Sequence, residues 1–97
     1  MSITFKDVKE AAGDTPLSIH SGESTPDGYF AVSFPFLGLF TTYLLTGKPQ
    51  DENAPVVGRV EISDSRMRAN VYRGAGLIGG EYMVAYSYDE AFAKILG

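Results

Sequence analysis

Residues 29–36 read YFAVSFPF, and large apolar side chains occupy every second position of this stretch. The alternating apolar residues are Phe30, Val32, Phe34 and Phe36. A period of two is typical of a β-strand with one face in the core. Pro35 has no amide hydrogen to donate, so we expect this strand at a sheet edge or Pro35 near the strand's end.

Further strands are predicted on both sides of this stretch. Toward the N-terminus, residues 17–20 alternate apolar and polar side chains. Residues 39–46 are ambiguous, because Phe40 and Leu44 suit a helix while the threonines and Tyr43 favour a strand, and we assign a strand. Residues 56–62 and 67–72 form two strands joined across residues 63–65, and residues 81–88 alternate again.

Two helices are predicted at the ends of the chain. Thr4 and Asp7 form a cap before residues 5–12, and Gly13 can end that helix. Ser87 and Glu90 form a capping box before residues 88–96. We therefore expect one α+β domain over residues 1–97, with an antiparallel sheet of four to five strands, a short N-terminal helix and a C-terminal helix packed on the sheet.

An aromatic stripe runs along the two central predicted strands. It comprises Phe30, Phe34, Phe36, Leu39, Phe40 and Leu44. We interpret the stripe as core. The alternative is an interface between two copies of the chain, because a domain of 97 residues has limited interior for so many large side chains.

The amino-acid composition limits the kinds of covalent, metal-binding and catalytic site that the chain can form. The chain has no cysteine, which excludes disulfides and thiolate metal sites, and one histidine, His20, so any histidine-based site must be built on it. Glu23 and Asp27 follow His20 in the sequence and could join it in a metal site or in the catalytic site of a small enzyme. We interpret these two acids as solvated turn residues next to an outward-pointing His20, and predict no catalytic residue, metal or cofactor. The longest apolar stretch, residues 34–45, is too short to span a bilayer, and the N-terminus lacks an export signal. We expect a cytoplasmic protein without a membrane partner.

A glycine-rich segment, GAGLIGG at residues 74–80, contains the letters GxGxxG. In dinucleotide-binding folds this motif opens a helix. Here it precedes the strand pattern of residues 81–88, and too few residues follow it for such a fold. We interpret it as a hairpin connection whose glycines permit positive φ.

Four of the eight basic residues lie within residues 59–73 of an otherwise acidic chain with a net charge of −4. On a strand over residues 67–72, Arg66, Arg68, Asn70 and Tyr72 would share one face. Arginine and tyrosine are frequent at binding hot spots, and such a face can also contact phosphates. The alternative interpretation is an ordinary solvated strand face.

These features predict a non-enzymatic protein-binding module. Its predicted contact residues are Arg66, Arg68, Tyr72, Asp51 and Glu52. In general character the chain resembles the small, acidic, cysteine-free domains that bacteriophages encode against host defence, including anti-CRISPR proteins, and this resemblance is one of class only. It implies an inhibitor that uses carboxylates against nucleic-acid-binding surfaces, with Asp14, Glu23 and Asp27 as further candidates.

Two alternatives remain open at the sequence level. One is nucleotide or nucleic-acid binding through the arginine and tyrosine face, although the net negative charge disfavours nucleic acid as the main partner. The other is a structural subunit that forms a homo-oligomer, with a homodimer as its simplest form. The identity of a protein partner does not follow from the sequence.

Overall fold

The computed structural model describes residues 3–36, 38–62, 68–76 and 79–97. They form one antiparallel sheet with strand order β1-β2-β3-β4-β5-β6, in which neighbours in the sequence are neighbours in the sheet. The strands are β1 (Ser18–His20), β2 (Tyr29–Phe36), β3 (Leu39–Thr46), β4 (Val56–Ile62), β5 (Ala69–Arg73) and β6 (Glu81–Ala85). The helices are α1 (Phe5–Ala12), the 3-10 helix η1 (Gly22–Ser24) and α2 (Tyr88–Leu96).

The α+β class and both terminal helices are confirmed, and the strand count is corrected. The sheet has six strands rather than four to five, because even the three-residue β1 pairs with β2. The last strand ends at Ala85 rather than at residue 88, because Ser87 is the N-cap of α2 and Tyr88 already belongs to that helix. Residues 39–46 are a strand, as expected. The predicted turn at residues 63–65 lies outside the described residues.

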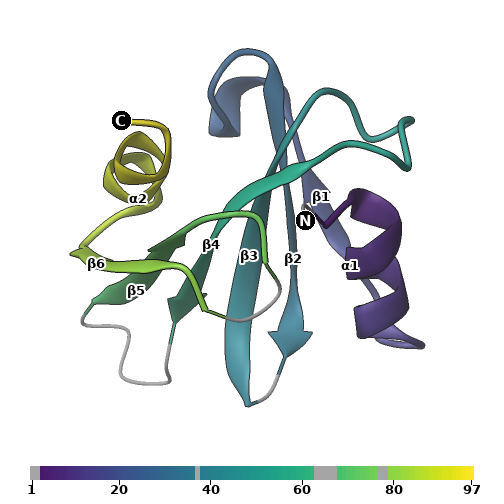
Figure 1. Cartoon of the computed structure of the whole chain (residues 1–97), viewed down its shortest axis with the longest axis horizontal. Coiled ribbons are helices and arrows are strands. Elements are labelled where there is room, and N and C mark those ends of the chain that lie inside the picture. Colours follow the sequence, from purple (N-terminus) through teal and green to yellow (C-terminus); the bar gives the residue numbers. More distant parts are fainter. Residues whose placement is uncertain (1–2, 37, 63–67, 77–78) are drawn as a thin grey trace.

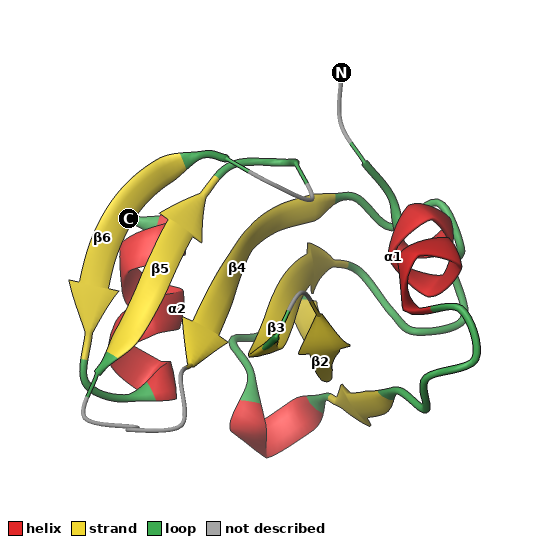
Figure 2. Ribbon diagram, turned by 90° about the horizontal axis from the view of Figure 1, so that it is seen from below, coloured by secondary structure: helices red, strands yellow, loops and turns green. Residues whose placement is uncertain are grey.

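The two helices cover opposite faces of the sheet at opposite ends. Helix α1 lies beside β2, whereas α2 lies against β4, β5 and β6 (Figure 1). Figure 2 shows α2 behind β5 and β6, with α1 beyond β3 on the other side of the molecule. One core cluster therefore joins α1 to β2 and β3, and a second joins α2 to β4, β5 and β6. Neither helix is long and apolar enough to cross a bilayer.

The middle strands are buried on both faces. In β2, Phe30 and Phe34 pack in the α1 cluster, while Ala31 packs in the α2 cluster and Ser33 is also buried. Pro35 lies near the end of β2, beyond the residues that β1 pairs, so its missing amide hydrogen breaks no ladder bond on that side. The predicted aromatic stripe is thus mostly core, and Phe40 is its exposed member at 43%.

Local caps fix both helices where the sequence predicts them. The backbone amide of Thr4 donates to Asp7 Oδ2 at 2.9 Å, and α1 ends at Gly13, whose φ of 60° favours glycine. At α2, the Glu90 amide donates to Ser87 Oγ at 3.1 Å. The Glu90 carboxylate accepts from the amide of Tyr86, one residue before the N-cap. These bonds pair amides that a helix leaves unsatisfied at its start.

Gly58 allows α2 to approach β4 closely. A Cβ atom at position 58 would lie 2.6–2.9 Å from three side-chain carbons of Ile95. Ile95 is buried and β-branched, so it has little freedom to move away.

We expect Gly58→Ala to lower the free energy of unfolding by about 1–3 kcal/mol through overpacking. Urea unfolding of a double-mutant cycle with Ile95→Ala checks the cause. The cost of Gly58→Ala should shrink when Ile95 is already truncated. If Gly58→Ala lowers the free energy of unfolding equally with Ile95 present and with Ile95→Ala, the contact with Ile95 is not the cause.

Candidate functional site

A single row of side chains crosses all six strands on the face that α1 shares. The strand register places the row in the order Ile19, Val32, Tyr43, Arg59, Tyr72 and Tyr82. Directly opposed side chains on one sheet face are close enough to interact. The row is buried at its centre and exposed at both ends.

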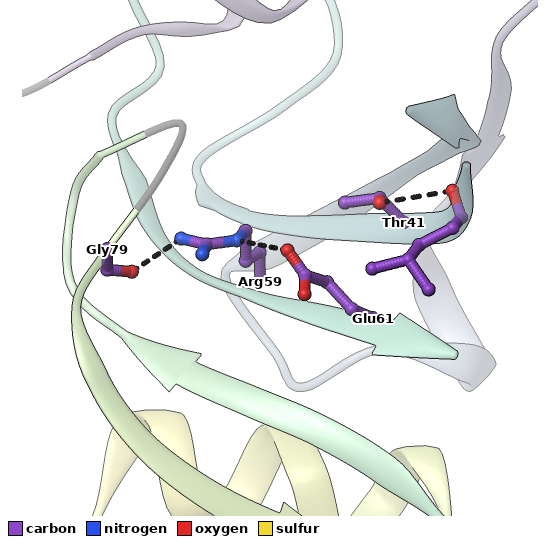
Figure 3. A network of polar contacts seen from close by, with 5 residues as sticks. Thr41, Arg59, Glu61 and Gly79 are labelled. Atoms are coloured by element: carbon purple, nitrogen blue, oxygen red, sulfur yellow. Dashed lines mark hydrogen bonds and ion pairs between the residues drawn. The ribbon is translucent and has the colours of Figure 1, made fainter. Parts of the chain in front are cut away.

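Arg59 is the buried cation of this row, with 4% of its surface exposed. Its Nε donates to Glu61 Oε2 at 2.9 Å, and its Nη1 donates to the carbonyl of Gly79 at 2.6 Å. Figure 3 shows the guanidinium between these two acceptors. The guanidinium also lies over the ring of Tyr72, 4.1 Å from the centroid. Arg59 therefore ties β4 to β5 and to the glycine-rich connection before β6.

Tyr82 continues the stack outward. Its ring centroid lies 5.5 Å from that of Tyr72, and its hydroxyl donates to Asn70 Oδ1 at 3.1 Å. Burial first and the nearby Glu61 carboxylate second raise the pKa of Tyr72 above the ordinary value of a tyrosine. We call Arg59, Asn70, Tyr72 and Tyr82 the tyrosine platform. The platform presents the exposed ring of Tyr82, which is held on one side by the ring of Tyr72 and at its hydroxyl by Asn70.

The structure places part of the predicted arginine and tyrosine face in the platform. Asn70 and Tyr72 belong to it, and Arg68 is exposed two residues before Asn70. Arg66 lies outside the described residues. Arg59 and Tyr82 were not among the contact residues predicted from the sequence. Alternation in residues 56–62 and 81–88 carried a signal for both, but the pairing of β4, β5 and β6 was needed to place them beside Tyr72.

Two of the four arginines in residues 59–73 are hydrogen-bonded within the fold. Besides Arg59, Arg73 donates from Nε and Nη2 to the Lys94 carbonyl, at 3.2 and 2.8 Å. The Arg73 guanidinium also lies 3.7 Å from the Glu81 carboxylate. Binding of a phosphate backbone depends on cations that are free to replace counterions. Arg59 and Arg73 therefore offer no such free cation. Arg68 is exposed and Arg66 lies outside the described residues, so nucleic-acid binding by their face stays a prediction.

The predicted acidic contact residues lie elsewhere. Asp51 and Glu52 are in the loop between β3 and β4, on the α1 side of the molecule and away from β5 (Figures 1 and 2). Glu52 Oε1 accepts from Lys9 Nζ at 2.8 Å, and this bond lowers the pKa of Glu52. Asp51 Oδ1 accepts from the amide of Asn53. The acidic and the arginine-rich groups thus do not form one surface.

The remaining predicted residues are dispersed. His20 is exposed in β1, as are Asp14 and Asp27 in their connecting segments. The side chain of Glu23 lies outside the described ones. Among the described side chains, no three histidine or carboxylate groups come together as a metal site would require.

Helix α2 covers part of the free edge of β6. Lys94 Nζ donates to the carbonyl of Val84 at 2.6 Å, and the Tyr86 amide donates to Glu90. Glu90 also pairs with Lys94 at 3.2 Å. The hydrogen bond from the Tyr86 amide is the main cause that lowers the pKa of Glu90, and the hydrogen bond from Lys94 is the next largest. Occupied edge groups oppose pairing with a strand from another protein, so the face of Tyr82 is the more available surface.

Comparison of this chain with known protein families, with curated proteins and with solved structures finds no match. The function of the platform must therefore be inferred from its own geometry.

We expect Glu61→Leu to destabilise the fold by about 3 kcal/mol, because it leaves the buried Arg59 cation without its carboxylate. Adding Arg59→Met should recover part of that loss, since no buried charge then remains. Urea unfolding of both single variants and the double variant measures this coupling. Additive losses would show that Glu61 does not compensate Arg59.

The stability of the fold should fall above pH 10. Burial is the main cause that raises the pKa of Tyr43 from 10 to about 12, with a smaller contribution from Glu61. Because the folded pKa exceeds the unfolded one, the stabilisation is complete below pH 10 and is lost as pH rises to about 12. Two pKa units correspond to about 3 kcal/mol. Denaturant unfolding between pH 9 and 12 should show a shallower decline in Tyr43→Phe than in the unmodified chain, and parallel declines would contradict the assignment.

Proposed function

We propose that this chain is a non-enzymatic protein-binding module whose contact surface is the tyrosine platform. The observation that carries the proposal is Tyr82, which is 51% exposed although its ring lies against Tyr72 and its hydroxyl is bonded to Asn70. Tyrosine is one of the residue types enriched at binding hot spots.

Fixing the ring before binding lowers the entropic cost of association. An ordinary exposed side chain loses about 0.5–1.5 kcal/mol of rotamer freedom when a partner immobilises it. Tyr82 has already lost much of that freedom, because Arg59 holds Tyr72 and Tyr72 holds Tyr82. The buried cation therefore supports the contact surface without touching the partner.

The surroundings of the platform suit a protein partner. Arg68 and Tyr86 are both exposed, and Tyr86 is 72% exposed just beyond the end of β6. This combination offers a cation and two rings, which favours a partner surface with apolar groups around an acidic side chain. An inhibitor of a host-defence complex and a homo-oligomeric subunit both stay predictions, which the experiment below separates.

Substitution of Tyr82 tests this proposal. Tyr82→Ala should weaken binding of the physiological partner roughly 30-fold, the effect expected of a hot-spot residue worth about 2 kcal/mol. The matched control is Ile19→Ala, which removes a side chain of similar exposure from the other end of the same row. Affinity capture at physiological salt compares the unmodified chain with both variants.

A protein recovered with the unmodified chain and with Ile19→Ala, but lost with Tyr82→Ala, supports the platform. Recovery of the chain itself would identify a homo-oligomer, and light scattering would measure its size. A partner retained by Tyr82→Ala would contradict the platform as the contact surface.

A further inference from the structure

A groove of about 400 Å³ lies on the α2 side of the sheet, opposite the tyrosine platform. Ala31 and Ser33 of β2 and Thr42 of β3 line it from the sheet, and Tyr88 and Phe92 line it from α2. The rings of Tyr88 and Phe92 lie 5.7 Å apart. Volumes of this size are typical of sites that enclose small molecules. The groove is thus distinct from the surface proposed for a protein partner.

Three hydroxyl groups form a chain along this groove. Ser33 Oγ and Thr42 Oγ1 lie 2.8 Å apart, and Thr42 Oγ1 and Tyr88 Oη lie 3.1 Å apart. Ser33 and Thr42 are 3% and 2% exposed. Ser33 and Thr42 are therefore almost withdrawn from bulk water, whereas Tyr88, at one end of the row of hydroxyls, is 38% exposed.

The three hydroxyl groups carry one hydrogen more than their two mutual hydrogen bonds use. Each hydroxyl carries one donor hydrogen, so three hydroxyls offer three, and the two hydrogen bonds consume two. Among the described residues, no further acceptor is within hydrogen-bond reach of these three oxygens. The spare hydrogen lies at one end of this row, on Ser33 or on Tyr88. On Ser33 it would be buried without an acceptor, which is costly, and on Tyr88, which also lines the groove, it is open to an incoming molecule. In both cases it favours an acceptor that enters the groove.

The charges at the groove limit the kind of molecule that can enter. In the part of the chain that the structure describes, its ionisable lining residues besides Tyr88 are His20 and Asp89, and both are exposed. None of the described residues that line it is an arginine or lysine that could pair with a carboxylate or phosphate, and Asp89 repels such anions. The aromatic rings of α2 favour a flat apolar body.

We propose that this groove binds a small neutral molecule with an aromatic or similarly flat body and a carbonyl group. The body lies against Tyr88 and Phe92. The carbonyl oxygen accepts a hydrogen bond from the spare hydroxyl hydrogen of Ser33, Thr42 and Tyr88.

Two probes with the same number of heavy atoms test the acceptor. Acetophenone carries the carbonyl, and isopropylbenzene is its hydrocarbon counterpart. In ¹H–¹⁵N NMR titrations, both should shift amide resonances around the groove, and acetophenone should bind roughly 2- to 12-fold more tightly, the effect of one net hydrogen bond. In the triple variant Ser33→Ala, Thr42→Val, Tyr88→Phe, this preference should disappear.

Two further variants test the location. Ser18→Phe places a ring in the groove from the exposed end of β1 and should abolish binding of both probes. Ile19→Phe adds the same ring to the opposite face of β1 and should leave binding unchanged. These variants and the two-probe comparison keep the test decisive even if the triple variant does not fold.

Equal affinities of the unmodified chain for the two probes would overturn the proposal, as would shifts remote from the groove or undiminished binding to Ser18→Phe. None of these outcomes bears on Tyr82. The groove and the platform can therefore fail independently.

Discussion

The buried guanidinium of Arg59 is the constraint on which one half of the molecule depends. A cation at 4% exposure requires charge compensation and satisfied donors. Glu61, the Gly79 carbonyl and the face of Tyr72 supply them from β4, the glycine-rich connection and β5. The same contacts hold the outer strands in register and fix the stack that ends in Tyr82. Structure and proposed recognition thus share one set of interactions.

The opposite face of the sheet follows a different logic. There α2 packs on β4 through Gly58 and Ile95, and its capping and charged side chains close the end of β6. The helix reaches only part of the sheet, so its first turn stands beside β2 and β3 and leaves the groove. One short helix therefore completes a core, protects a strand edge and forms one wall of a cavity.

Prediction from the sequence worked where the signal was local. Alternation in residues 29–36 and the caps at Thr4 and Ser87 give the correct elements, because these preferences act within a few residues. The burial of Ala31 and Ser33 was not foreseen, since only a second helix on the other face buries that side of β2. The predicted contact residues Asp51 and Glu52 do not lie beside Arg68 and Tyr72, because the fold places the two pairs at different ends of the molecule. Their separation could not be predicted from the sequence.

The sequence by itself determined the α+β class, the two helices and an inventory with no cysteine and a single histidine, because composition and periodicity are properties of the chain alone. Only the tertiary structure decided which arginine is buried, which tyrosine is exposed and which hydroxyls meet. Those outcomes depend on register across strands, where partners such as Arg59 and Tyr72 are distant in sequence. Pairing over that distance is set by the packing of the whole sheet, which no local pattern records.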